Sequence, residues 1–163
     1  MHIADGVLSA PTIAATVAGT AGLLVWSLKD VAEKEIPKIS LTTGTFFAVS
    51  LISIPVGPST IHPLMAGLMG VMLGRRAPLS FFIALLLQAL LFQHGGLTSL
   101  GANTLMLAIP ALIAGQLYRR LSLAPLMKGM VTGGLATVLT VLLLVLVLAV
   151  SQPLFSRGTF SVV

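Results

Sequence analysis

The chain has no cysteine among its 163 residues, and only 8% of its residues are charged. The missing cysteine excludes a disulfide framework, a thiolate metal site and a thiol nucleophile. The charged fraction is about a third of that in an ordinary soluble domain, so the composition does not fit a soluble protein. The sequence also has no G-x-x-x-x-G-K-[ST] phosphate loop and no H-E-x-x-H motif. We therefore expect a protein that is not an enzyme and has no cofactor of its own.

Apolar residues dominate instead, at 56% of the chain, and the mean hydropathy is +1.08. Six apolar segments separated by short charged or Gly/Pro-rich breaks predict membrane-spanning helices. The six segments are residues 11–28, 40–56, 61–74, 79–92, 100–118 and 127–150. We expect an all-α integral membrane helix bundle of about six transmembrane helices, forming a single membrane domain over residues 1–163. Its parts would be an N-terminal loop (1–10), the bundle (11–150) and a tail (151–163).

Basic residues lie between these segments rather than along one face, so the net charge of +5 indicates topology and not nucleic-acid binding. Eight of the nine follow the first, third or fifth segment: Lys29, Lys34, Lys38, Arg75, Arg76, Arg119, Arg120 and Lys128. The positive-inside rule makes that side cytoplasmic. We therefore expect a multi-pass protein of the inner or plasma membrane with its N-terminus outside.

This topology sends all three histidines to the outer face. The amine of Met1, the amide of His2 and the His2 ring can place three nitrogens in one plane, an arrangement typical of copper(II), nickel(II) and cobalt sites. The first residues lack the positive charge of a signal peptide, so we expect Met1 to keep its free amine. His62 is the candidate for the fourth nitrogen, and His94 competes with it. Each histidine could equally be a solvated or helix-end residue.

Other residues could support such a site. His94 or Asn103 could hydrogen-bond a ligand histidine from outside, although Asn103 could also cap the fifth helix. Asp5 precedes Gly6, a turn signal that could fold the N-terminus back onto the bundle. Ala14 and Ala18 stand four residues apart, a spacing that lets membrane helices approach closely. They could pack internally or dock another membrane protein.

Three stretches carry a family resemblance: MHIADGVLS, GPSTIHPLMAGLMGVMLG and QALLFQHGGLTSLGANT. They closely resemble the substrate-binding membrane component (CbiM/NikM type) of cobalt and nickel energy-coupling factor transporters. The resemblance implies that Met1 and His2 bind the ion through amine, amide and ring nitrogens, and that His62 completes a square-planar site. It further implies a transmembrane coupling subunit, cytoplasmic ATPase subunits and, in some systems, a small accessory membrane protein. These ligands suit Co²⁺ and Ni²⁺ alike.

One departure from the family concerns the end of the chain. Family members continue after the sixth segment into a further segment with a histidine and a glutamate, whereas this sequence ends at Val163. A second polypeptide could supply that segment, and the predicted ion site lies wholly within the residues present. Two other functions remain compatible with the residues: a passive channel for metals or small solutes, and a structural or assembly protein of the membrane.

Overall fold

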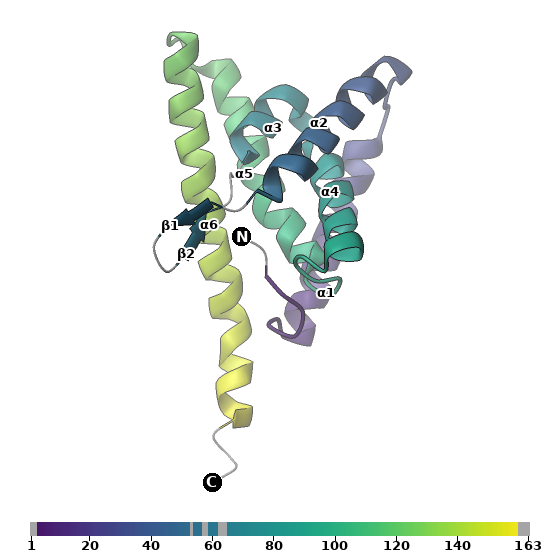
Figure 1. The fold of residues 1–163 in the computed structure, drawn as a ribbon, viewed down its shortest axis with the longest axis vertical. Helices are drawn as coiled ribbons and strands as arrows, with labels where there is room; N and C mark the ends of the chain where they lie inside the picture. Colours follow the sequence, from purple (N-terminus) through teal and green to yellow (C-terminus); the bar gives the residue numbers. More distant parts are fainter. Residues whose placement is uncertain (1–2, 53, 57–58, 62–64, 160–163) are drawn as a thin grey trace.

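The computed structural model describes residues 3–52, 54–56, 59–61 and 65–159, with side chains for residues 3–52 and 65–151. Helices dominate this part of the chain (Figure 1). They are α1 (Ala10–Leu28), α2 (Ile36–Ser50), α3 (Ala66–Leu73), α4 (Ala77–Phe92), α5 (Leu100–Arg120) and α6 (Pro125–Thr159). The predicted helical class is therefore confirmed, with one exception. Strands β1 (Ile54–Val56) and β2 (Ser59–Ile61) pair antiparallel between α2 and α3, with Ile54 opposite Ile61.

Helix α5 lies at the centre and packs against α1, α3, α4 and α6. Glycine permits its closest approach to a neighbour: a Cβ at Gly70 of α3 would overlap the backbone of Ala111, and one at Gly115 would overlap the backbone of Gly70. Ala111 and Gly115 are thus a small-residue pair used for internal packing. Around this contact, buried Phe46 and Phe81 meet edge to face with ring centroids 5.0 Å apart.

Four stretches of the described residues are long and apolar enough to cross a membrane: Ala10–Leu28, Ala66–Phe92, Leu100–Arg120 and Pro125–Ser151. The stretch Ala66–Phe92 contains both α3 and α4, which join at a 3-10 turn, η2 (Gly74–Arg76), where Gly74 has φ +53°. The multi-pass membrane class is therefore confirmed, whereas six separate spans stay a prediction.

The predicted second and third segments differ most from the structure. We expected helix over residues 40–56 and 61–74, but α2 ends at Ser50 and α3 has only 8 residues. Proline interrupts this region at positions 55, 58 and 63, and proline cannot donate the hydrogen bond that a helix interior needs. The apolar composition of these segments fits a membrane protein, but it did not predict where the helices begin and end.

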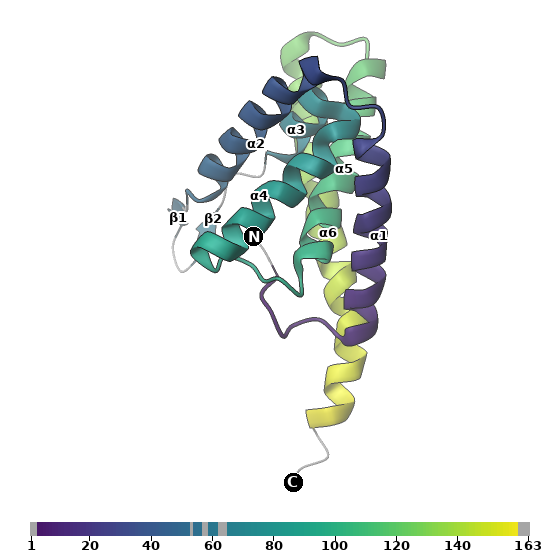
Figure 2. The ribbon, with the colours of Figure 1, turned by 90° about the vertical axis from the view of Figure 1, so that its right-hand side faces the viewer.

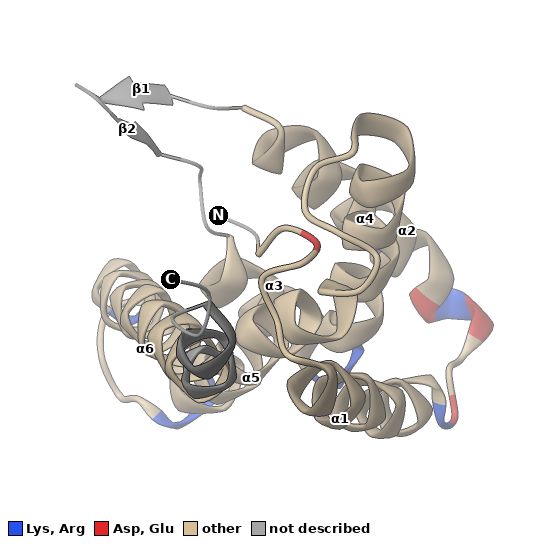
Figure 3. Ribbon diagram, turned by 90° about the horizontal axis from the view of Figure 1, so that it is seen from below, with Lys and Arg blue, Asp and Glu red and all other residues tan. Residues whose placement is uncertain are grey.

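Basic residues gather at one end of the bundle. The α1–α2 connection, η2 and the α5–α6 connection lie at its upper end, and the N-terminal segment crosses its lower end to reach α1 (Figures 1 and 2). Seen from below, lysine and arginine lie at the far end of the bundle (Figure 3). The charge pattern agrees with the predicted segregation of basic residues, while the side on which the cytoplasm lies stays a prediction.

Two arginines close the upper end of α1. Arg76 is 5% exposed and donates to the carbonyls of Ser27, Lys29 and Asp30, and to the Glu35 carboxylate at 2.8 Å. Arg75 donates to the Lys29 carbonyl and lies over the Trp26 ring. The last carbonyls of a helix have no partner within it and carry partial negative charge, so guanidinium groups stabilise them. We call Arg75, Arg76 and Glu35 the arginine cap.

Candidate metal centre

The N-terminal segment is held against the start of α5 through the backbone of Ile3. Asn103 Oδ1 accepts from the Ile3 N–H at 2.8 Å, and Asn103 Nδ2 donates to the Ile3 carbonyl at 3.0 Å. Ser99 Oγ donates to the same carbonyl at 2.5 Å. Ile3 and Asn103 are buried. A buried backbone group without a partner costs about 1–3 kcal/mol, so these bonds fix where Ile3 lies.

Asp5 ties the same segment to the loop before α5. Its Oδ1 accepts from the Thr98 N–H at 2.8 Å and the Thr98 hydroxyl at 2.5 Å, and its Oδ2 accepts from the Leu97 N–H at 3.2 Å. These bonds, the Thr98 hydroxyl above all, hold the pKa of Asp5 below its ordinary value. A Cβ at Gly96 would overlap the Asp5 carboxylate. We call Ile3, Asp5, Thr98, Ser99 and Asn103 the N-terminal clamp.

The three predicted ligands, Met1, His2 and His62, lie outside the described residues. The structure instead describes where their neighbours lie. Ile3 directly follows His2 in the sequence, and the clamp fixes where Ile3 lies. Met65 follows the segment that carries His62 and directly precedes α3. The ligand roles stay predictions.

His94 lies in the loop that carries the clamp. Gln93, with φ +51°, ends α4, and the His94 N–H donates to the Gln88 carbonyl at 3.2 Å. His94 is half-buried. Within the described residues, no group of three or more His, Cys, Asp or Glu could hold a metal ion. This part of the chain therefore holds no complete site of these side chains, and His94 stays a candidate for support.

The structure shows what Asn103 and Asp5 contact, which the sequence alone left open. Asn103 lies within the first turn of α5 and holds Ile3, while the N-cap position belongs to Ser99. Asp5 forms a turn with Gly6, whose φ is +81°. Sequence reasoning missed Thr98 and Ser99, although both stand in the polar run directly before the fifth helix. It also missed the buried amide of Gln88, which donates to Ser50 at the end of α2.

Ala14 and Ala18 both lie on an exposed face of α1. The opposite face is buried and consists of hydroxyl residues: Thr12, Thr16, Thr20 and Ser27. Thr20 donates to the Gly101 carbonyl at 2.9 Å, which ties α1 to the first turn of α5. The two alanines are therefore free of internal packing, and docking stays a proposal for them.

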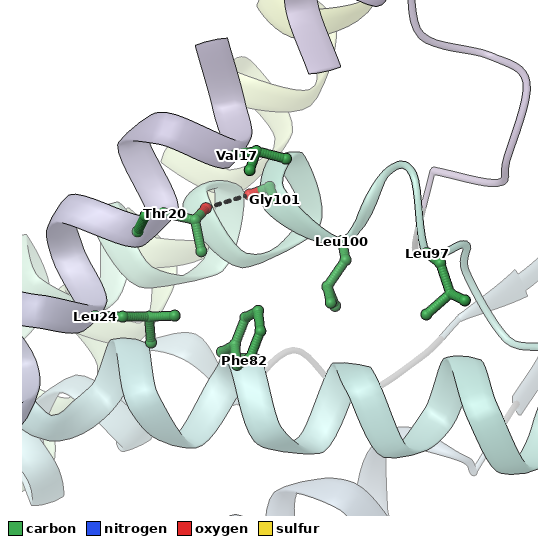
Figure 4. Close-up of a pocket in the computed structure, with 8 residues that line it drawn as sticks. Val17, Thr20, Leu24, Phe82, Leu97, Leu100 and Gly101 are labelled. Atoms are coloured by element: carbon green, nitrogen blue, oxygen red, sulfur yellow. Dashed lines mark hydrogen bonds between the residues drawn. The ribbon is translucent and has the colours of Figure 1, made fainter. Parts of the chain in front are cut away.

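A cavity of about 250 Å³ lies between α1, α4 and the start of α5. Figure 4 shows Val17 and Leu24 of α1, Phe82 of α4, and Leu97 and Leu100 around it. The described residues that line it include no imidazole or carboxylate group. Leu97 connects it to the clamp, because the Leu97 N–H also donates to Asp5.

Four apolar stretches of membrane-spanning length, charge gathered at one end and a clamped N-terminal segment define a multi-pass helical membrane protein. Its relatives are transport proteins, and no enzyme family is indicated. The chain belongs to the CbiM family, described as the cobalt uptake substrate-specific transmembrane region, whose sequence profile matches residues 2–163. This result confirms the resemblance to cobalt and nickel transport components.

Two relatives illustrate the similarity. A putative metal transport protein of Haemophilus influenzae is 38% identical over 73% of this chain and 58% of its own length. The fused nickel transport protein NikMN of Rhodobacter capsulatus is 34% identical over 72% of this chain and 36% of its own length. The chain thus spans about half the length of the curated relatives it matches.

Solved structures share the fold. A crystal structure of a truncated transition metal transporter superposes with a TM-score of 0.83 at 30% identity, covering 94% of this chain and 76% of that one. A second crystal structure of a transition metal transporter has the same TM-score at 29% identity, with 94% and 72% coverage. This chain therefore shares its helix arrangement with two transition metal transporters.

Proposed function

We propose that this chain captures Co²⁺ or Ni²⁺ for import, as the substrate-specificity component of an ATP-driven energy-coupling factor transporter. The Met1 amine, the His2 amide and ring, and the His62 ring would supply four nitrogens in a plane. His94 would support the site from outside. Support comes from family membership, and the single structural observation that carries the proposal is the N-terminal clamp.

The clamp supports this function for a physical reason. A free chain end is normally mobile, and a metal site made from the first two residues needs a fixed approach. Asn103 and Ser99 fix Ile3, the next residue, and Asp5 secures the turn behind it. A protein with no use for its N-terminus would gain little from burying Ile3 in this way.

Partner proteins would supply the energy. The proposed assembly includes a transmembrane coupling subunit that docks on the Ala14 and Ala18 face of α1, cytoplasmic ATPase subunits and, in some systems, a small accessory membrane protein. The N-terminus would face outward in the inner or plasma membrane, because the end of the bundle with the basic residues would lie in the cytoplasm. The chain itself needs no resident cofactor.

The test is calorimetric binding of each ion to detergent-purified chain that starts at Met1. Adding residues before Met1, or making His2→Ala, is expected to abolish tight binding, and binding is expected to release protons because the Met1 ammonium and the His2 backbone amide must lose theirs. A tag after Val163 is the matched control and should leave binding intact. Equal affinity of the extended and native N-termini would refute the chelate.

A further inference from the structure

A second cavity, of about 400 Å³, lies between α3, α5 and α6. It is separate from the clamp, since its lining comes from other residues. Met65, which directly precedes α3, and Val71 of α3 line it, together with Gly129 and Gly133 of α6 and Tyr118 at the end of α5. It therefore extends to the α5–α6 connection, at the upper end of the bundle in Figure 1. Figure 3 shows lysine and arginine at this end.

Glycines of α3 and α6 border this cavity beside a close contact of the two helices, since a Cβ at Gly67 would overlap the backbone of Gly133. Gly129 and Gly133 stand one helical turn apart, and a Cβ at either would meet no atom within 4 Å. The helix around them is strongly apolar, and only 11% of the window in Pro125–Ser151 is buried inside the protein. A groove between membrane-spanning helices that the chain does not fill is open to hydrocarbon, and a lipid acyl chain is the hydrocarbon at hand.

Basic residues lie at the α5–α6 end of the same groove, which we call its mouth. The Lys128 Nζ lies 5.6 Å from the ring centroid of Tyr118, which lines the groove. Arg119 and Arg120 follow Tyr118 and are exposed. Helix α6 begins at Pro125, so the positive end of its dipole points to this mouth.

Negative charge is absent from the helices that form the groove. The four acidic residues of the chain all belong to other elements: Asp5, Asp30, Glu33 and Glu35. Figure 3 shows them on the N-terminal segment and the α1–α2 connection, away from α6. The mouth is therefore complementary to an anion.

We propose that this groove binds an anionic phospholipid, with an acyl chain in the cavity beside the contact of α3 with α6 and the phosphate at Lys128. Basic pockets between membrane helices on the cytoplasmic side recognise such headgroups. A zwitterionic phospholipid fits the groove equally well but brings a positive charge of its own to a positive mouth. The proposal is independent of the metal site.

The experiment is native mass spectrometry of the full chain in detergent, titrated with phosphatidylglycerol or with phosphatidylcholine of the same acyl chains. Phosphatidylglycerol is expected to bind more tightly. Lys128→Ala should weaken its binding by about fivefold, which corresponds to about 1 kcal/mol for one basic residue at an anionic surface. Phosphatidylcholine binding should not change. Lys34→Ala, an exposed lysine of the α1–α2 connection, is the charge control.

Filling the groove tests the acyl-chain part. Gly133→Leu should weaken both lipids, whereas Gly134→Leu should not, because Gly134 also has open space but lies outside the cavity lining. Equal binding of the two lipids, or no effect of Lys128→Ala, overturns headgroup recognition. Equal effects of the two leucine variants overturn the groove as the site. Displacement of phosphatidylglycerol by inorganic phosphate alone, without sensitivity to Gly133→Leu, also overturns the proposal.

Discussion

The two ends of the bundle are held together by different kinds of side chain. At the lower end, the N-terminal clamp uses an amide, hydroxyls and one carboxylate, and its partners are mainly backbone groups of a terminal segment. At the upper end, the arginine cap uses two guanidinium groups on the carbonyls that end α1. The clamp positions a chain end, whereas the cap joins helices.

This difference leads us to expect that one end of the bundle mainly determines the free energy of unfolding and the other mainly determines metal affinity. Releasing residues 3–8 would leave the six helices in place, because α5 keeps its contacts with α1, α3, α4 and α6. Removing the cap would take the guanidinium donors from the Ser27 carbonyl in α1 and from the Lys29 and Asp30 carbonyls that follow it, and would leave Glu35, which precedes α2, without its ion pair. We therefore expect cap variants to lower the free energy of unfolding and clamp variants to lower metal affinity.

The largest expected effect is that of Arg76→Ala. Arg76 is buried and serves three carbonyls and one carboxylate, so its loss should lower the free energy of unfolding by about 3 kcal/mol. Thermal unfolding in detergent measures this change. Affinity for nickel or cobalt should stay the same in the protein that remains folded.

Arg120→Ala is the control for that variant, because Arg120 lies at the same end but is exposed. It should change stability by less than about 0.5 kcal/mol. If the Arg76→Ala protein that remains folded binds nickel or cobalt more weakly than the native chain does, the two ends of the bundle are coupled. That outcome would contradict the separation of stability from metal binding.

The sequence predicted those features of the fold that depend on a single local property, such as hydropathy or the position of charged residues. The helices α1, α4, α5 and α6 follow from long apolar segments, and the gathering of basic residues at one end follows from their spacing. The hairpin at Ile54–Ile61 was missed because apolar composition alone does not distinguish helix from strand. The clamp was only partly predictable, because the contact between Ile3 and Asn103 joins residues 100 positions apart.

Asn103→Ala should have the next largest effect, and it should appear in metal binding. The variant loses both bonds to the Ile3 backbone, so the segment that carries His2 is no longer fixed. We expect metal affinity to fall by about tenfold, equivalent to about 1.4 kcal/mol for these hydrogen bonds. Calorimetry measures the affinity, and the unfolding temperature should fall by less than in Arg76→Ala.

Thr104→Ala is the matched control, since Thr104 is the next residue of α5, is buried, and donates only within its own helix, to the Leu100 carbonyl. It should keep native affinity. If both variants bind metal as well as the native chain does, Ile3 does not need the clamp and the proposed link between clamp and metal site fails.

Asp5→Asn should have the smallest effect and a distinctive pH dependence. The folded protein holds the pKa of Asp5 below its ordinary value of 3.8, mainly through the Thr98 hydroxyl. The carboxylate therefore stabilises the clamp above pH 3.8, and this contribution is lost as the pH falls through the lowered pKa. The native chain should melt above the Asp5→Asn variant at neutral pH, and the gap should shrink only below pH 3.8. A gap that instead closes near about pH 6.5, the ordinary pKa of histidine, would assign the dependence to a histidine and remove Asp5 from the clamp.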